Sequence, residues 1–197
     1  MIADWWLGAV VKSLIFKGIL AILMISAGCA VKPVASLPEL QFAVVGKFGI
    51  RDGAQGYAAR FEWRHYADEY RIEVWGPLGQ GRTHLRGTAH SMQVSRGEKV
   101  LAQGTPDQMM YDHLGWSVPV EVLPAWLAGR PQHALTYFGA VHDGSGHFTQ
   151  FHQAGWQVDL SGYTARPNGG EIVVTPAKIV AQNGSRKVTV AIRDYVH

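Results

Sequence analysis

A strict alternation of apolar and polar side chains is the feature of this sequence that most constrains its fold. In residues 57–64, Tyr, Ala, Phe and Trp alternate with Arg and Glu, and residues 69–75 repeat the pattern. A period of two places successive side chains on opposite faces of a β-strand. Both segments therefore predict strands with one apolar face. Similar patterns predict further strands at 42–50, 82–88, 90–95, 98–103, 146–153, 155–163, 171–175, 178–182 and 186–193.

Glycine is abundant enough to supply the turns between so many short strands. It accounts for 23 of the 197 residues, whereas an average chain contains roughly 7%. Asn168-Gly169-Gly170 and Asn183-Gly184 are typical of tight hairpin turns, because these residues adopt positive φ at little cost. The order of elements is therefore a β meander, a central interruption and a second meander.

The interruption between the two meanders has helical signals. Thr105-Pro106-Asp107-Gln108 is typical of a helix start, with Thr as the cap and Gln completing a capping box. Gly115 should end this helix, and a second helix over 119–128 should end at Gly129. Neither helix can bury its apolar side alone, so we expect both to cover the concave face of a curved antiparallel sheet. The predicted fold is mainly β with a small helical insertion: an open, strongly curved half-barrel with a helical lid over an apolar cavity.

The amino-terminal segment resembles an export signal. Lys12 and Lys17 precede an apolar run of about ten residues, and Ser26-Ala27-Gly28 then precede Cys29. This run is short for a membrane-spanning helix, which needs about 20 residues. The pattern resembles the bacterial lipobox, in which the signal is removed and the cysteine thiol is acylated. Ser26 departs from the leucine that is usual at its position.

These features predict three parts of the chain. Residues 1–28 are the lipoprotein signal peptide, residues 29–41 a lipid-anchored tether, and residues 42–197 the folded domain. The alternative is an uncleaved anchor helix over residues 5–28, with Cys29 incidental. Since Cys29 is the sole cysteine, the sequence excludes an internal disulfide and a cysteine-based zinc site.

Several other functions are disfavoured by what the sequence lacks. It has no G-x-S-x-G motif, no phosphate-binding loop and no pair of carboxylates suited to acid–base catalysis. The net charge is +3, and the basic residues are scattered, which argues against nucleic-acid binding. We therefore predict a protein that is not an enzyme, with no cofactor and no metal.

The turn Trp75-Gly76-Pro77-Leu78-Gly79-Gln80-Gly81 separates two predicted strands. Leu78 lies at its centre with no local apolar partner. One interpretation is that Leu78 folds back onto the sheet. The other is that Pro77, Leu78 and Gly79 form a protruding apolar tip, which on a membrane-tethered domain can contact a bilayer.

Five motifs in the predicted domain resemble the LolB family of outer-membrane lipoprotein receptors. They are Phe61-x-Trp63, Tyr70-x-Ile72, Gly76-Pro77-Leu78-Gly79, Leu123-x-x-Trp126-Leu127-x-Gly129-x-Pro131, and Phe151 followed by Gly155-Trp156-x-Val158. The resemblance covers nearly all of the mature chain in the same order. The carboxyl end departs from it, with Arg193-Asp194-Tyr195 where the family often has Trp.

The resemblance implies a receptor anchored to the periplasmic face of the outer membrane. It would accept acylated lipoprotein cargo from the periplasmic carrier LolA and insert it among outer-membrane lipids, acting as a monomer. Leu78 would aid insertion. The candidates for the acyl-chain cavity or lid are Phe61, Trp63, Ile72, Val74, Met110, Leu114, Trp126 and Trp156. Each is equally consistent with plain core packing, because a lipid cavity and a core use the same residue types.

Two alternatives to this receptor remain open at the level of the sequence. One is an envelope lipoprotein that binds another apolar ligand, such as a fatty acid or a lipopolysaccharide tail. The other is a structural lipoprotein that braces the envelope and takes up no acyl chain.

Overall fold

The structure, a computed structural model, describes residues 39–114, 116–168 and 170–196. The predicted signal peptide, Cys29 and nearly all of the predicted tether lie outside the described residues. The first strand begins at Leu40, two residues before the predicted start of the domain. No helix in the described part of the chain has the length and apolar character needed to cross a membrane.

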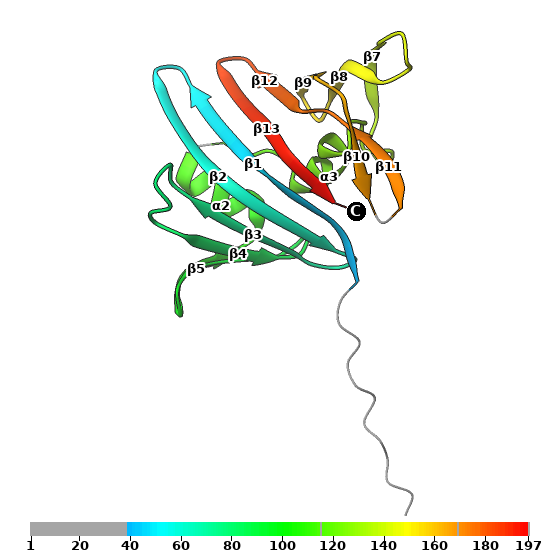
Figure 1. Cartoon of the computed structure of the whole chain (residues 1–197). Coiled ribbons are helices and arrows are strands. Elements are labelled where there is room, and N and C mark those ends of the chain that lie inside the picture. Colours follow the sequence, from blue (N-terminus) through cyan, green and yellow to red (C-terminus); the bar gives the residue numbers. More distant parts are fainter. Residues whose placement is uncertain (1–38, 115, 169, 197) are drawn as a thin grey trace, which may run out of the picture. The chain divides into compact units, whose positions relative to one another are not determined.

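The domain is built on one antiparallel sheet of eleven strands in the order β6-β5-β4-β3-β2-β1-β13-β12-β9-β8-β7 (Figure 1). A separate hairpin pairs β10 with β11. The strands are β1 (Leu40–Asp52), β2 (Gln55–Tyr66), β3 (Tyr70–Trp75), β4 (Thr83–Gly87), β5 (Met92–Arg96), β6 (Lys99–Gly104), β7 (Tyr137–His142), β8 (Phe148–Gln153), β9 (Trp156–Ser161), β10 (Thr164–Asn168), β11 (Glu171–Thr175), β12 (Lys178–Asn183) and β13 (Arg186–Val196).

The alternating segments form the strands that the sequence predicts. In β2, Ala59, Phe61 and Trp63 are buried, whereas Arg60 and Arg64 are exposed. All eleven predicted strands are present, and the two predicted Asn-Gly turns join β10 to β11 and β12 to β13. Strands β7 and β10 were not predicted.

The central segment contains α2 (Pro106–Leu114), the 3-10 helix η1 (Val120–Val122) and α3 (Leu123–Leu127). Thr105 caps α2 as predicted, since its Oγ1 accepts a hydrogen bond from the backbone N–H of Gln108 at 3.2 Å. The predicted capping box is wrong in its second half, because the Gln108 side chain donates to Asp112 instead. Gly129 follows α3 with φ 81°, in the left-handed conformation expected after a helix end.

The helical segment connects the two edges of the sheet. Strand β6 is one edge of the sheet and β7 the other, so residues 105–136 must run from edge to edge. In Figure 1, α2 and α3 lie within the curve of the sheet, with α2 behind β1 and β2 and α3 next to β13. The predicted open sheet with a helical lid is confirmed.

Gly46 lies at an irregularity in the pairing of β1 with β13. The register between β1 and β13 shifts between Val45 and Gly46, and such bulges bend a strand and increase its twist. A Cβ at Gly46 would lie 2.3 Å from the carbonyl oxygen of Ala191. The strands can approach this closely because residue 46 has no side chain.

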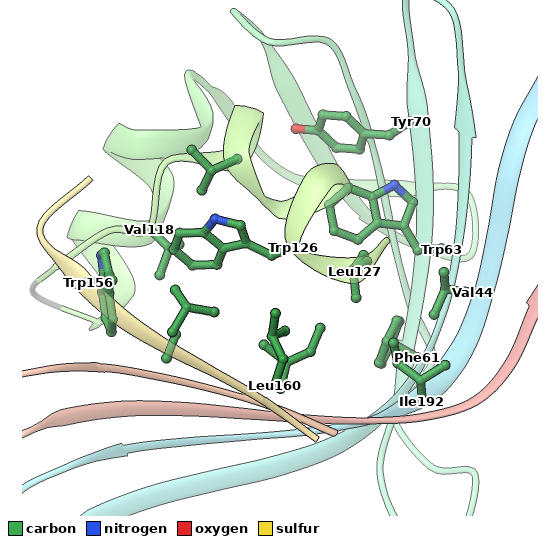
Figure 2. Close-up of a cluster of buried hydrophobic side chains, with 14 of the residues drawn as sticks. Val44, Phe61, Trp63, Tyr70, Val118, Trp126, Leu127, Trp156, Leu160 and Ile192 are labelled. Carbon is green, nitrogen blue, oxygen red and sulfur yellow. The ribbon is translucent and has the colours of Figure 1, made fainter. Parts of the chain in front are cut away.

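The core lies between the lid and the concave face. Trp126 and Leu127 of α3 belong to one buried cluster with Phe61, Leu160 and Ile192 of the sheet (Figure 2). All five side chains are buried. Burial of one such side chain contributes about 1.5–3 kcal/mol, so this cluster fixes α3 against the sheet.

Candidate functional site

A pocket of about 1360 Å³ opens between the sheet and the lid. Its sheet wall comes from the start of β1, the end of β2, the start of β3 and the end of β13, and its lid wall from η1 and α3. The turn after β4 and strand β11 also line it. The lid residues are Val120, Glu121, Pro124, Ala125 and Ala128. Pockets for small molecules usually measure about 300–1,000 Å³, so this one has room for a larger ligand.

Aromatic rings form the sheet wall of the pocket. The ring of Phe42 stacks between those of His65 and Tyr195, with centroids 4.9 and 5.8 Å away. Trp63 packs edge-on against Tyr70 at 6.0 Å. These five rings make a rigid, largely apolar surface that suits hydrocarbon chains.

Carboxylates dominate the charged residues of the pocket. They are Glu39, Asp68, Glu69, Glu121 and Glu171, and Arg130 is the one lysine or arginine among the described lining residues. Hydrogen bonds from Arg86 and Arg71 hold the pKa of Glu69 below its usual value. The pocket is therefore acidic, although the whole chain carries a net charge of +3.

Burial shifts the titration of the groups on the aromatic wall. It raises the pKa of Tyr70 to about 12 and lowers the pKa of His65 below its usual value. Near neutral pH the Tyr70 hydroxyl is protonated and the His65 imidazole is uncharged. The aromatic wall itself thus carries no charge.

The predicted cavity and lid residues fall into different environments. Trp63 is 6% exposed and lines the pocket. Trp126 belongs to the filled core, where its indole N–H donates to the side chain of Gln153 at 3.0 Å. Trp156 packs against Trp116 with ring centroids 5.5 Å apart.

The remaining candidates lie on the concave face or on α2. Phe61 is buried in the core cluster, and Ile72 and Val74 are half-buried against it. Met110 on α2 is half-buried, and the side chain of Leu114 lies outside the described residues. Sequence reasoning did not select Phe42, His65, Tyr70 or Tyr195, although continuing the alternation of β2 and β3 places His65 and Tyr70 on the face of Trp63.

Leu78 projects from the turn between β3 and β4. Its side chain is 84% exposed, so it does not fold back onto the sheet. The turn is closed by hydrogen bonds from the N–H of Gly76 to the Gln80 carbonyl and from the N–H of Gly79 to the Gly76 carbonyl. Gly79 has φ 78°, which glycine adopts without strain.

The base of this turn is held by Arg82. Its guanidinium lies 5.0 Å from the centre of the Trp75 ring and donates to Glu73 at 2.6 Å. Pro77 further restricts the backbone beside Leu78. The turn is therefore shaped in advance to present one apolar side chain to solvent.

The domain is an open antiparallel β-sheet curved around a helical lid, with a large pocket between them that has an aromatic wall. The fold resembles that of a LolA superfamily protein from Nitrosomonas europaea, with a TM-score of 0.51 and 8% identity over 78% of this chain and 84% of that one. At such low identity the likeness shows the fold alone.

Sequence comparison gives the family. Residues 40–195 match the family model described as outer membrane lipoprotein LolB. The outer-membrane lipoprotein LolB of Bordetella pertussis is 33% identical over 154 residues, which are 74% of this chain and 77% of that protein. That of Chromohalobacter salexigens is 29% identical over 154 residues, 78% of this chain and 70% of the relative. The chain belongs to the LolB family.

Membership of the family confirms three predictions from the sequence. These are the family itself, a location at the outer membrane and a role as a lipoprotein receptor. The carrier, the individual site residues and the lipid anchor stay proposals.

Proposed function

We propose that this protein is anchored to the outer membrane through Cys29, receives lipoproteins from the carrier LolA and inserts them into the outer membrane. The observation that carries this proposal is the large open pocket beneath the lid, on a chain of the LolB family. Its aromatic wall suits the acyl chains of the cargo. The protein acts as a monomer in this scheme.

The direction of transfer comes from differences in affinity. A ligand moves from carrier to receptor only if the receptor binds it more favourably, and onward only if the bilayer is more favourable still. The sequence offers no nucleotide-binding motif to supply energy. The receptor therefore forms the middle step of a downhill series.

Leu78 supports the last step. Burying a leucine side chain yields about 1.5–3 kcal/mol, and Leu78 is 84% exposed in the absence of a bilayer. Its insertion therefore favours membrane contact roughly ten- to hundredfold. The contact brings the domain to the lipid surface while the pocket holds the cargo.

The acidic pocket argues against the other apolar ligands. Fatty acids carry a carboxylate, and the head group that bears lipopolysaccharide tails carries phosphates. The four carboxylates of the pocket other than the arginine-paired Glu69 repel both. The acylated cysteine of a lipoprotein carries no charge in its lipid part. The alternative ligands would be detected by native mass spectrometry of protein purified from cells.

The test is a transfer assay with Leu78→Glu. Lipidated receptor in liposomes is mixed with carrier loaded with a fluorescent lipoprotein, and acceptance and delivery are followed separately. We expect normal acceptance and delivery reduced at least tenfold, because a charged tip does not enter the bilayer.

Ile172→Glu is the matched control. Ile172 is 73% exposed, nearly as much as Leu78, and lies between two pocket residues of β11 that face the other way. We expect this variant to deliver normally. Unchanged delivery by Leu78→Glu, or an equal loss in both variants, would refute the role of the tip.

A further inference from the structure

Three buried polar atoms without a hydrogen-bond partner among the described residues lie on one wall of the pocket. Within residues 39–196 as far as the structure describes them, four buried side-chain atoms have no partner, and three belong to Trp63, His65 and Tyr70. These three residues line the pocket. His65 lies directly opposite Tyr70 in the pairing of β2 with β3, and Trp63 shares their face.

The chemistry of two of these atoms defines the partner that they lack. Trp63 and Tyr70 are 6% and 3% exposed, so bulk solvent has little access to these two groups. An indole N–H donates only, and a phenol that stays protonated is a good donor. The missing partner is therefore a hydrogen-bond acceptor that arrives with the ligand.

The charge around the pocket restricts the kind of acceptor. Five carboxylates and one arginine line it, so an anionic acceptor such as a phosphate would be repelled. A neutral carbonyl oxygen would not. Within a lipid-modified cysteine, the glyceryl esters place such carbonyls directly at the head of the acyl chains.

We propose that the indole N–H of Trp63 and the hydroxyl of Tyr70 bind the ester carbonyl oxygens of the diacylglyceryl group on the cargo. The aromatic wall then recognises where the acyl chains begin as well as their apolar surface. This inference rests on the proposed receptor function.

The ligand must uncover these atoms in order to reach them. A Cβ at Gly87 would lie 2.7 Å from the Tyr70 hydroxyl oxygen, so the backbone at Gly87 covers that group. The following turn, Thr88–Ser91, is exposed except at the half-buried Thr88, and Thr88, Ala89 and His90 lie on the pocket wall. Bonds gained with the ligand offset the cost of moving this turn, because the closed packing leaves the same groups unpaired.

The test compares two ligands on wild type, on Tyr70→Phe and on a control variant. The ligands are a fluorescent tripalmitoyl-cysteinyl peptide and its analogue with ether links in place of the glyceryl esters. Binding to lipidated receptor is measured in a detergent without ester groups. We expect wild type to prefer the ester peptide about two- to tenfold for each hydrogen bond, and Tyr70→Phe to lose part of this preference.

Tyr163→Phe is the matched control, since the Tyr163 hydroxyl donates to the Phe148 carbonyl at 2.6 Å and does not line the pocket. It should keep the ester preference but melt at a lower temperature than wild type. Tyr70→Phe should melt no lower than wild type, because it removes a hydroxyl that makes no bond.

The outcomes separate this inference from the proposed function. If wild type binds neither peptide, the receptor function itself is refuted. Equal binding of ester and ether peptides by wild type refutes the carbonyl site but leaves the receptor function standing. A preference that persists unchanged in Tyr70→Phe refutes the role of its hydroxyl.

Discussion

Gln153 should be the most sensitive polar position in the domain. It is 1% exposed and makes four hydrogen bonds. Its Oε1 accepts from Trp126 Nε1 at 3.0 Å and from the Gln132 N–H at 2.9 Å. Its Nε2 donates to the carbonyls of Gln132 at 2.8 Å and Leu135 at 3.0 Å. This is the full capacity of a glutamine amide.

Gln153→Met keeps the approximate volume and removes all four bonds. Each bond contributes about 0.5–1.5 kcal/mol net. The free energy of unfolding should therefore fall by roughly 3–5 kcal/mol, because the buried groups that were bonded to Gln153 are left without a partner. For a domain of this size that corresponds to a drop in Tm of about 6–20 °C. Because the residues bonded to Gln153 follow or belong to α3, the hydrogen exchange of the Gln132 amide should also accelerate.

Thermal unfolding followed by circular dichroism measures the effect, with Gln150→Met as the control. Gln150 lies on the same strand and makes one side-chain bond, to Asp159 at 2.8 Å. Its replacement should cost about 1 kcal/mol. If Gln153→Met melts within about 2 °C of wild type, the four bonds do not hold the lid and the reasoning is refuted.

Two further predictions concern the pocket wall and the bend of the sheet. Burial lowers the pKa of His65 below its usual value, so below about pH 6.5 the unfolded chain binds a proton that the folded chain does not. Stability should therefore fall on acidification, and it should fall less in His65→Phe than in the exposed control His90→Gln. Urea unfolding at pH 7.5 and 5.5 measures the difference. Gly46→Ala should cost about 1–3 kcal/mol through its clash with the Ala191 carbonyl, whereas Gly49→Ala, with its nearest atom at 3.9 Å, should cost under about 1 kcal/mol; equal midpoints in urea would contradict this.

Alternation predicted the strands well because their side chains face either the core or solvent. It missed β7 because the whole of Tyr137–His142 is exposed at the edge of the sheet, where nothing selects one apolar face. Gly139 also has φ 62°, and the register with β8 shifts beside it. Strand β10 was missed because Pro167 argues against a strand, yet a two-stranded hairpin tolerates it.

The candidate site was only partly predictable for a different reason. Trp63 and Trp126 look alike in sequence, each within an apolar pattern. Trp63 lines the pocket and Trp126 fills the core, because Gln153, at a distance of 27 residues, bonds its indole. The residues adjacent to Trp126 in the sequence do not reveal a hydrogen-bond partner that lies so far along the chain. The exposure of Leu78 was easier to predict, because a short turn of Pro and Gly offers its central leucine no apolar partner nearby.

The position of β13 has a consequence for how the chain folds. Most strands pair with a neighbour in sequence, but β1 pairs with β13, so its partners are separated by nearly the whole domain. Pairings of high sequence separation form slowly. We expect the two meanders to form first. The pairing of β1 with β13 should form last, once residues 186–196 are available. A chain threaded through a membrane from its amino end would then stay incompletely folded until its final strand emerged, which suits a protein that must cross one membrane before it works at another.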